Sequence, residues 1–252
     1  MREWFLAAFE RCKTFTIWLW FGDGTRAPWA RRIAMGVFFF LVPAPIFLIL
    51  LFRFLPVPVT PQIIIGVLSG DDVHYRWVGA GEISPFLGRA VIGAEDQKFC
   101  QHNGFDWQSI DKVIKTHERH PRRRLRGAST ISQQTARTVF LLPTRSWVRK
   151  GMEAYITVLM EALWPKRRIL TAYLNLVDWG HGNFGAEAAA QSYFHKSAAS
   201  LSTNEAARLA AILPNPDGWR AVAPGPYVAS RTGSLVARIW QVQRDGLDYC
   251  VR

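Results

Sequence analysis

Two adjacent carboxylates, a histidine and a glycine lie close together between residues 93 and 106. Apolar residues at helical spacing precede them, so a mostly buried helix is expected to end at Glu95 and Asp96. Gly104 then breaks the helix, and Asp106 suits the N-cap of a second one. A carboxylate at such a corner can take a proton from a substrate hydroxyl. The segment is therefore the first candidate for catalytic residues.

A Glu-Asp pair alone is more typical of a solvated helix end, but further polar blocks follow it in order. The second runs from Gly127 to Gln134, the third is Arg149-Lys150-x-x-Glu153, and the fourth runs from Ile169 to Asn175. A block from Gly185 to Phe194 and the segment 213–216 (Leu-Pro-Asn-Pro) complete the series. An ordered set of this size is far more specific than one short motif.

These blocks resemble the peptidoglycan glycosyltransferases, and among them the monofunctional biosynthetic transglycosylases that carry no penicillin-binding domain. The first block of that family has the form Glu-Asp-x-x-Phe-x-x-His-x-Gly, which is matched here by Glu95, Asp96, Phe99, His102 and Gly104. The resemblance covers roughly residues 85 to 217. It implies a mainly α fold, with a lysozyme-like glycosyltransferase lobe and a small membrane-proximal lobe.

The reaction implied by the resemblance is glycosyl transfer between two copies of lipid II, the undecaprenyl-pyrophosphate-linked disaccharide-pentapeptide. The product is a growing β-1,4-linked glycan strand, with release of undecaprenyl pyrophosphate. The resemblance makes Glu95 the general base. Glu153 would assist departure of the pyrophosphate, directly or through a divalent cation such as Mg²⁺ or Mn²⁺, and no tightly bound cofactor is expected.

The resemblance also assigns substrate-binding positions. Arg137 and Arg145 match positions that hold the pyrophosphate, although the family usually has lysine at the first. The other expected substrate-binding residues are Asp96, Phe99, His102, Ser129, Thr130, Gln133, Gln134, Arg149 and Lys150. Thr171 stands where many bifunctional relatives have glutamate, so it receives no role.

An uncharged stretch of twenty residues, 33–52, is about the length needed to cross roughly 30 Å of hydrocarbon. A cleaved signal peptide is the alternative, but the stretch is too long and begins too late. Arginines are denser before it than after it, which predicts a cytoplasmic N-terminal segment (1–32) and an extracytoplasmic catalytic domain. The expected location is the inner membrane, with a single span. Pro43 and Pro45 are expected to kink the helix.

Residues 53–70 read as a proline-rich linker with a short strand near 63–67, and residues 71–252 as the glycosyltransferase domain. Strand signals are otherwise sparse. Thr130 is expected to start one helix and Thr144 to cap the next. On the second helix, Arg145, Arg149 and Glu153 would share one face, with Trp147 and Val148 on the apolar side. Later helices are expected at 166–177, 186–194, 202–213 and 227–244.

The formal net charge is +12, and eleven Lys and Arg against one acidic residue lie between Lys112 and Lys150. Such a cluster can bind nucleic acid, anionic lipid or a phosphorylated substrate. Nucleic acid fits poorly with an extracytoplasmic domain that has no nucleic-acid fold signature. A phosphate-bearing substrate fits best, because one arginine guanidinium can bind two phosphate oxygens at once. Proteins of cell-wall synthesis or division stay open as partners.

Two other functions stay open. A lysozyme-like hydrolase also uses two carboxylates around a sugar, although it would need neither the Arg145–Glu153 row nor a membrane anchor. A non-catalytic membrane-tethered scaffold would keep the blocks only for structure. Cys100 and Cys250 would share an oxidising compartment, where a disulfide is allowed. The sequence favours two free thiols over a bridge.

Overall fold

The computed structural model describes residues 28–120 and 128–252, which divide into two compact units at residues 51 and 52. Residues 1–27, most of the expected cytoplasmic segment, lie outside the described part. So does the basic stretch 121–127, which ends with Gly127, the first residue of the second sequence block.

The first unit contains most of the apolar N-terminal helix, whose last three residues belong to the second unit. The helix is assigned as α2 (Pro28–Leu41) and α3 (Pro43–Phe54), interrupted at Val42 just before a proline that has no N–H to donate. Val42 N still donates to Phe38 O at 2.9 Å. The helical stretch Trp29–Phe54 spans 26 residues and is long and apolar enough to cross a membrane. It extends beyond the expected 33–52 at both ends.

The expected strand near 63–67 is wrong, because these residues form helix α4 (Pro61–Leu68). The Oγ1 of Thr60 accepts from Ile63 N at 3.3 Å, and Pro61 occupies the first helical position. This start signal outweighs the strand preference of three successive isoleucines. Within the described residues, the strands are limited to β1 (His74–Tyr75) and β2 (Asn183–Phe184), which pair in parallel.

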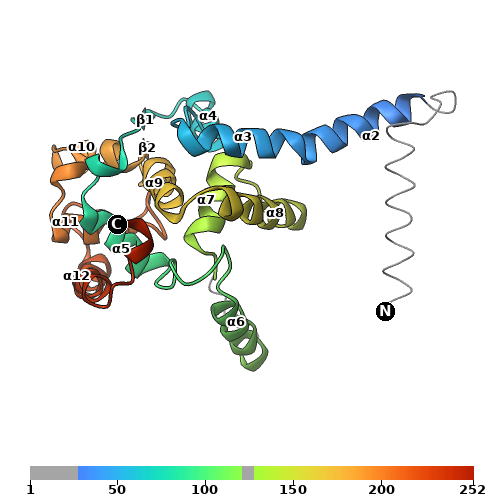
Figure 1. The fold of residues 1–252 in the computed structure, drawn as a ribbon. Helices are drawn as coiled ribbons and strands as arrows, with labels where there is room; N and C mark the ends of the chain where they lie inside the picture. The colour runs from blue at the N-terminus through green and yellow to red at the C-terminus, as the bar shows by residue number, and fades with distance from the viewer. Residues whose placement is uncertain (1–27, 121–127) are drawn as a thin grey trace. The chain divides into compact units, whose positions relative to one another are not determined.

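The second unit is built from helices that pack in two sets (Figure 1). In one set α5 packs against α11 and α12, and in the other α7 packs against α8 and α9. Their bounds are α5 (Pro85–Glu95), α7 (Ile131–Phe140), α8 (Trp147–Leu163), α9 (Lys166–Leu176), α11 (Thr203–Ile212) and α12 (Pro226–Arg244). Fully buried Leu87, Ile131 and Leu209 show that both sets enclose apolar cores. The mainly α prediction is confirmed, and the arrangement is consistent with a lysozyme-like lobe.

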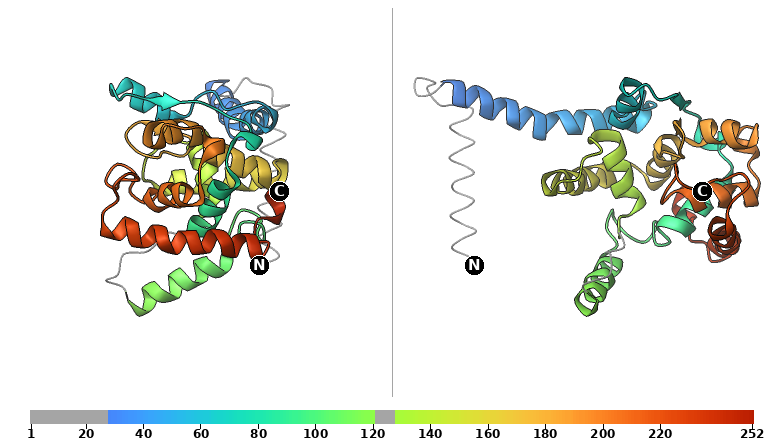
Figure 2. Two further views of the ribbon diagram at one scale, coloured as in Figure 1. Left: turned by 90° about the vertical axis from the view of Figure 1, so that its left-hand side faces the viewer. Right: turned by 180° about the vertical axis from the view of Figure 1, so that it is seen from behind.

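The remaining elements are short or peripheral. Helix α10 (Ala186–Phe194) contacts α9 and β2, whereas α6 (Trp107–Arg119) lies apart from the other helices and has no buried residue (Figures 1 and 2). Three single 3₁₀ turns are η1 (Ala80–Glu82), η2 (Ala198–Ser200) and η3 (Tyr249–Val251). Helix α6 therefore depends on local contacts at its N-terminus.

Most helix starts occur where the sequence placed them. Asp106 caps α6, and capping boxes at Thr130 and Ser202 begin α7 and α11.

The start of α8 differs from the prediction. Its N-cap is Ser146, whose Oγ accepts from Arg149 N at 3.1 Å, so Thr144 is not the cap and Arg145 precedes the helix. The expected helical row of three charges is therefore reduced to Arg149 and Glu153.

The apolar side of α8 also differs from the expectation. Trp147 and Val148 are 92% and 80% exposed, and the buried positions of α8 begin only at Glu153. Helical periodicity identifies an apolar stripe but not what covers it, which can be protein or lipid. The first turn of α8 is thus an exposed apolar surface rather than part of the core.

The end of α3 is held by Arg168 of α9. Its Nε and Nη2 donate to Phe52 O at 2.9 and 2.7 Å, and the guanidinium lies 4.7 Å from the centre of the Trp77 ring. Burial lowers the pKa of Arg168, with the nearby Tyr75 acting in the opposite direction. These contacts lie within the second unit, of which Phe52 is the first residue.

Candidate active site

Glu95 is the last residue of α5 and is oriented by side chains from two other helices. Gln134 of α7 donates from Nε2 to Glu95 Oε2 at 3.0 Å. Tyr173 of α9 donates its hydroxyl to Gln134 Oε1 at 3.3 Å. Burial, together with the negative charge of Glu95, raises the pKa of Tyr173 well above its ordinary range, so this hydroxyl keeps its proton. The Tyr173 bond leaves the Gln134 amide facing Glu95.

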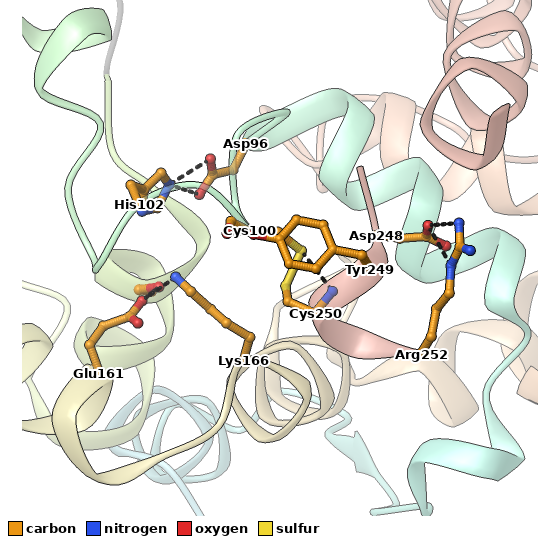
Figure 3. The surroundings of a disulfide bond; sticks show 10 residues. Asp96, Cys100, His102, Glu161, Lys166, Asp248, Tyr249, Cys250 and Arg252 are labelled. Atoms are coloured by element: carbon orange, nitrogen blue, oxygen red, sulfur yellow. Dashed lines mark hydrogen bonds and ion pairs between the residues drawn. A yellow bond between two sulfur atoms is a disulfide. The ribbon is translucent and has the colours of Figure 1, made fainter. Parts of the chain in front are cut away.

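Asp96 has a different environment from its neighbour. It is 7% exposed, and its two oxygens lie 2.9 and 3.1 Å from His102 Nε2 (Figure 3). One of them also accepts from Ile131 N at 3.0 Å, at the start of α7. Because its oxygens are already bonded, Asp96 serves to fix the corner rather than to accept a proton from substrate.

The turn at Gly104 brings the first and second sequence blocks together. Gly104 has φ +89°, and a Cβ added there would lie 2.8 Å from Thr157 Cγ2. Its carbonyl accepts from Thr130 Oγ1 at 2.6 Å. Phe99 is fully buried, with the Lys166 ammonium 4.5 Å from the centre of its ring. Phe99 therefore supports the corner from the core and does not face a substrate.

Glu153 forms a second charged cluster on α8. It is 2% exposed, and its Oε2 accepts from Arg149 Nη1 at 2.6 Å while its Oε1 is bound by Lys150 Nζ. The same Lys150 Nζ lies 3.4 Å from Ser129 Oγ. Ser129 in turn lines the pocket of Glu95. The two carboxylates that the sequence singled out are thus linked through Lys150 and Ser129.

A pocket of about 470 Å³ opens at Glu95. Its walls include Asp96 and Lys98 from the first block, Ser129 and Thr130 from the second, and Leu247 from the segment after α12. Leu247 belongs to none of the sequence blocks, and no signal in the sequence pointed to it. The C-terminal segment therefore contributes to the candidate site.

That segment is attached to the first block by a disulfide between Cys100 and Cys250, so the expectation of two free thiols is wrong (Figure 3). Tyr249 donates its hydroxyl to Cys100 O at 2.6 Å, and buried Asp248 pairs with Arg89 at 2.9 Å. The cysteines are 150 residues apart in sequence, and only the packing of α5 against α12 brings them together. The bridge holds Leu247 against the pocket.

Replacing both cysteines by serine is expected to lower the free energy of unfolding by about 2–5 kcal/mol, because the cross-link restricts the unfolded chain. Denaturant titration of the wild type with and without reductant, beside Cys100→Ser/Cys250→Ser, measures this. The reduced wild type should match the double variant. Equal stability of oxidised wild type and double variant would contradict the bridge.

Arg137 and Arg145 belong neither to the residues that orient Glu95 nor to the charged cluster around Glu153. Both are exposed, and neither side chain makes a hydrogen bond or ion pair with another described residue. Two further residues of the blocks serve the scaffold: Asn175 bonds both the N–H and the carbonyl of Val78, and Glu187 accepts from Ala198 N at 2.7 Å. The blocks thus contain residues that line the pocket, exposed cations, and residues whose hydrogen bonds stabilise the fold.

Glu153 was the only candidate ligand for a divalent cation, and its environment does not suit one. Both of its oxygens are already bound by cationic side chains. Among residues 28–120 and 128–252, no three His, Cys, Asp or Glu side chains are grouped so as to hold a metal ion. Glu153 is therefore occupied by Arg149 and Lys150, and a divalent cation brought by the pyrophosphate itself stays a prediction.

Comparison with known proteins identifies the family. The family model described as transglycosylase matches residues 62–239, which contain every block discussed above. A biosynthetic peptidoglycan transglycosylase of Caulobacter vibrioides is 48% identical over 221 residues, covering 88% of this chain and 96% of the relative. Relatives with the same name from Bdellovibrio bacteriovorus (46% identical, covering 83% of this chain and 85% of the relative) and Escherichia coli (54%, covering 67% and 69%) are also similar. The chain belongs to the transglycosylase family.

Proposed function

We propose that this chain is a peptidoglycan glycosyltransferase that polymerises lipid II into β-1,4-linked glycan strands during cell-wall synthesis. The observation that carries the proposal is the placement of Glu95. Its carboxylate lines a 470 Å³ pocket, is oriented by Gln134, and is linked through Ser129 to the cationic cluster on α8. The candidate base and the cations proposed to bind phosphate are thus connected through the contact between Lys150 and Ser129.

In the proposed reaction Glu95 takes the proton from the 4-hydroxyl of the acceptor sugar. The hydroxyl oxygen forms a bond to C1 of the donor sugar while the bond from C1 to the pyrophosphate breaks, and the electron pair leaves with the pyrophosphate. Arg149 and Lys150 would stabilise that developing negative charge, with Glu153 holding both cations in position. The exposed Arg137 and Arg145 would bind further phosphate oxygens.

The surroundings of Arg145 suit a lipid-linked donor. Leu142, Trp147 and Val148 are exposed at 59%, 92% and 80%. Apolar and aromatic side chains beside arginines are typical of surfaces that meet the boundary of a bilayer. We place the second unit outside the inner membrane and the N-terminus in the cytoplasm, with the helix Trp29–Phe54 as the single span.

Hydrolysis is the competing activity, and product analysis separates the two. Full-length protein in detergent is incubated with lipid II in one reaction and with preformed glycan strands in another. A transferase yields polymer and undecaprenyl pyrophosphate from the first and leaves the second unchanged. Shortening of preformed glycan without polymer would establish the hydrolase, and no reaction with either substrate would favour the scaffold.

Arg145→Ala is expected to slow polymerisation about 10- to 100-fold, since a hydrogen bond to a charged partner contributes about 1.5–3 kcal/mol. The melting temperature should hardly change, because the side chain is exposed and makes no ion pair within the described residues. Arg244→Ala is the control, as it removes another exposed arginine from the end of α12. A normal rate with a lowered melting temperature would make Arg145 structural.

A further inference from the structure

A second pocket of about 280 Å³ lies beside the catalytic pocket, at the N-terminus of α6. Lys98, Gln101 and Asp106 line both pockets. Phe105 and Trp107 line only the second one. Because the two pockets share three residues, they are neighbours on the surface of the second unit.

Two aromatic rings form one side of this second pocket. The rings of Phe105 and Trp107 stack with their centroids 5.4 Å apart and their planes 27° from parallel. Trp107 is 71% exposed although it is the first residue of α6. Phe105 thus supports one face of the indole and leaves the other open to a ligand. An aromatic side chain held in this way offers a large contact surface at little cost in conformational entropy.

Polar groups surround the aromatic pair. Lys98 Nζ bonds to Gln108 Oε1 at 2.5 Å and lies 3.8 Å from Asp106 Oδ1. The His102 side chain is 9% exposed, and its Nε2 lies 2.9 and 3.1 Å from the two Asp96 oxygens. Its Nδ1 is buried and has no hydrogen-bond partner among the described residues. His102 also lines the second pocket, so its ring adds another polar group to the wall.

We propose that this pocket is a saccharide subsite, in which Trp107 stacks against an amino-sugar ring of the glycan strand away from the bond being formed. The proposal rests on the proposed function, because the glycan strand is the product of that reaction. A pyranose ring presents an apolar C–H face to an aromatic ring and hydroxyls at its edge, which matches the two kinds of group in the pocket. A lipid tail would instead remove Lys98, Asp106 and Gln108 from water without replacing their hydrogen bonds.

The subsite is tested in the full-length protein with Trp107→Ala. Ile114→Ala is the matched control, since it removes another exposed apolar side chain from α6. Trp107→Tyr keeps an aromatic ring at this position and should keep most of the wild-type affinity and strand length. The first readout is the affinity for a soluble β-1,4-linked oligosaccharide of N-acetylated amino sugars without lipid or pyrophosphate, measured by calorimetry. The second is the length distribution of strands made from lipid II.

Trp107→Ala should bind the oligosaccharide about 3- to 10-fold more weakly than the wild type, in line with the strength of aromatic contacts. It should make shorter strands at a similar initial rate of lipid II consumption. Affinity and strand length equal to those of Ile114→Ala would overturn the subsite, as would an effect confined to vesicle or detergent binding. If the proposed function itself fails, the wild type makes no polymer, while the oligosaccharide affinity still reports on Trp107.

Discussion

Glu95→Gln is expected to reduce the rate of lipid II polymerisation by about 10²- to 10⁴-fold, the usual cost of losing a general base. The amide keeps the size of the carboxylate, and its oxygen can still accept from Gln134 Nε2. The variant should therefore fold normally and bind lipid II normally, since binding depends on the pyrophosphate and the lipid. Steady-state rates and lipid II affinity, measured on the same preparations, separate the two effects.

Glu118→Gln is the control for this variant, because it makes the same change at an exposed position of α6. It should keep the wild-type rate. A rate for Glu95→Gln within a few-fold of the wild type, in a protein that melts normally, would remove Glu95 from the reaction. Loss of rate together with loss of lipid II binding would instead make it a binding residue.

Glu153→Gln is expected to reduce the rate by about 10²- to 10³-fold, similar to the loss of one electrostatic contact to the transition state. The neutral amide no longer attracts Arg149 and Lys150, so both cations lose the position in which they would meet the pyrophosphate. Stability should also fall, because two cations are left beside a buried neutral group. Melting temperature and polymerisation rate are measured together.

Glu161→Gln supplies the control for the loss of stability. Glu161 lies eight residues further along α8 and is held by Ser132 and by Lys166 at 2.7 Å, outside the catalytic pocket. It should lower the melting temperature to a similar degree while affecting the rate much less. If both variants lose rate in proportion to their loss of stability, Glu153 has only a structural role.

The elements that the sequence predicted well are set by local chemistry. Capping residues such as Asp106 and Thr130 act on N–H groups within three residues, so their helices begin where the pattern placed them. The corner at Glu95 was predictable for the same reason. Its orientation was not, because Gln134 and Tyr173 come from helices that meet α5 only through tertiary packing.

The wrong predictions fall where one local pattern outweighs another, or where the structure depends on contacts between distant parts of the sequence. Isoleucines at 63–65 favour a strand in isolation, but a strand needs a partner, and the Thr60–Pro61 signal started a helix instead. Periodicity on α8 could not tell a buried stripe from the exposed Trp147. The Cys100–Cys250 bridge and the place of Leu247 depend on contacts across 150 residues of sequence, which no local pattern reveals.

The most direct measurement follows purified full-length protein with lipid II and quantifies both products over time. We expect a β-1,4-linked glycan polymer and one undecaprenyl pyrophosphate released for each glycosidic bond formed. We also expect Glu95→Gln to lower both products in parallel. Pyrophosphate release without polymer, or polymer formed at the wild-type rate by Glu95→Gln, would contradict the proposed function.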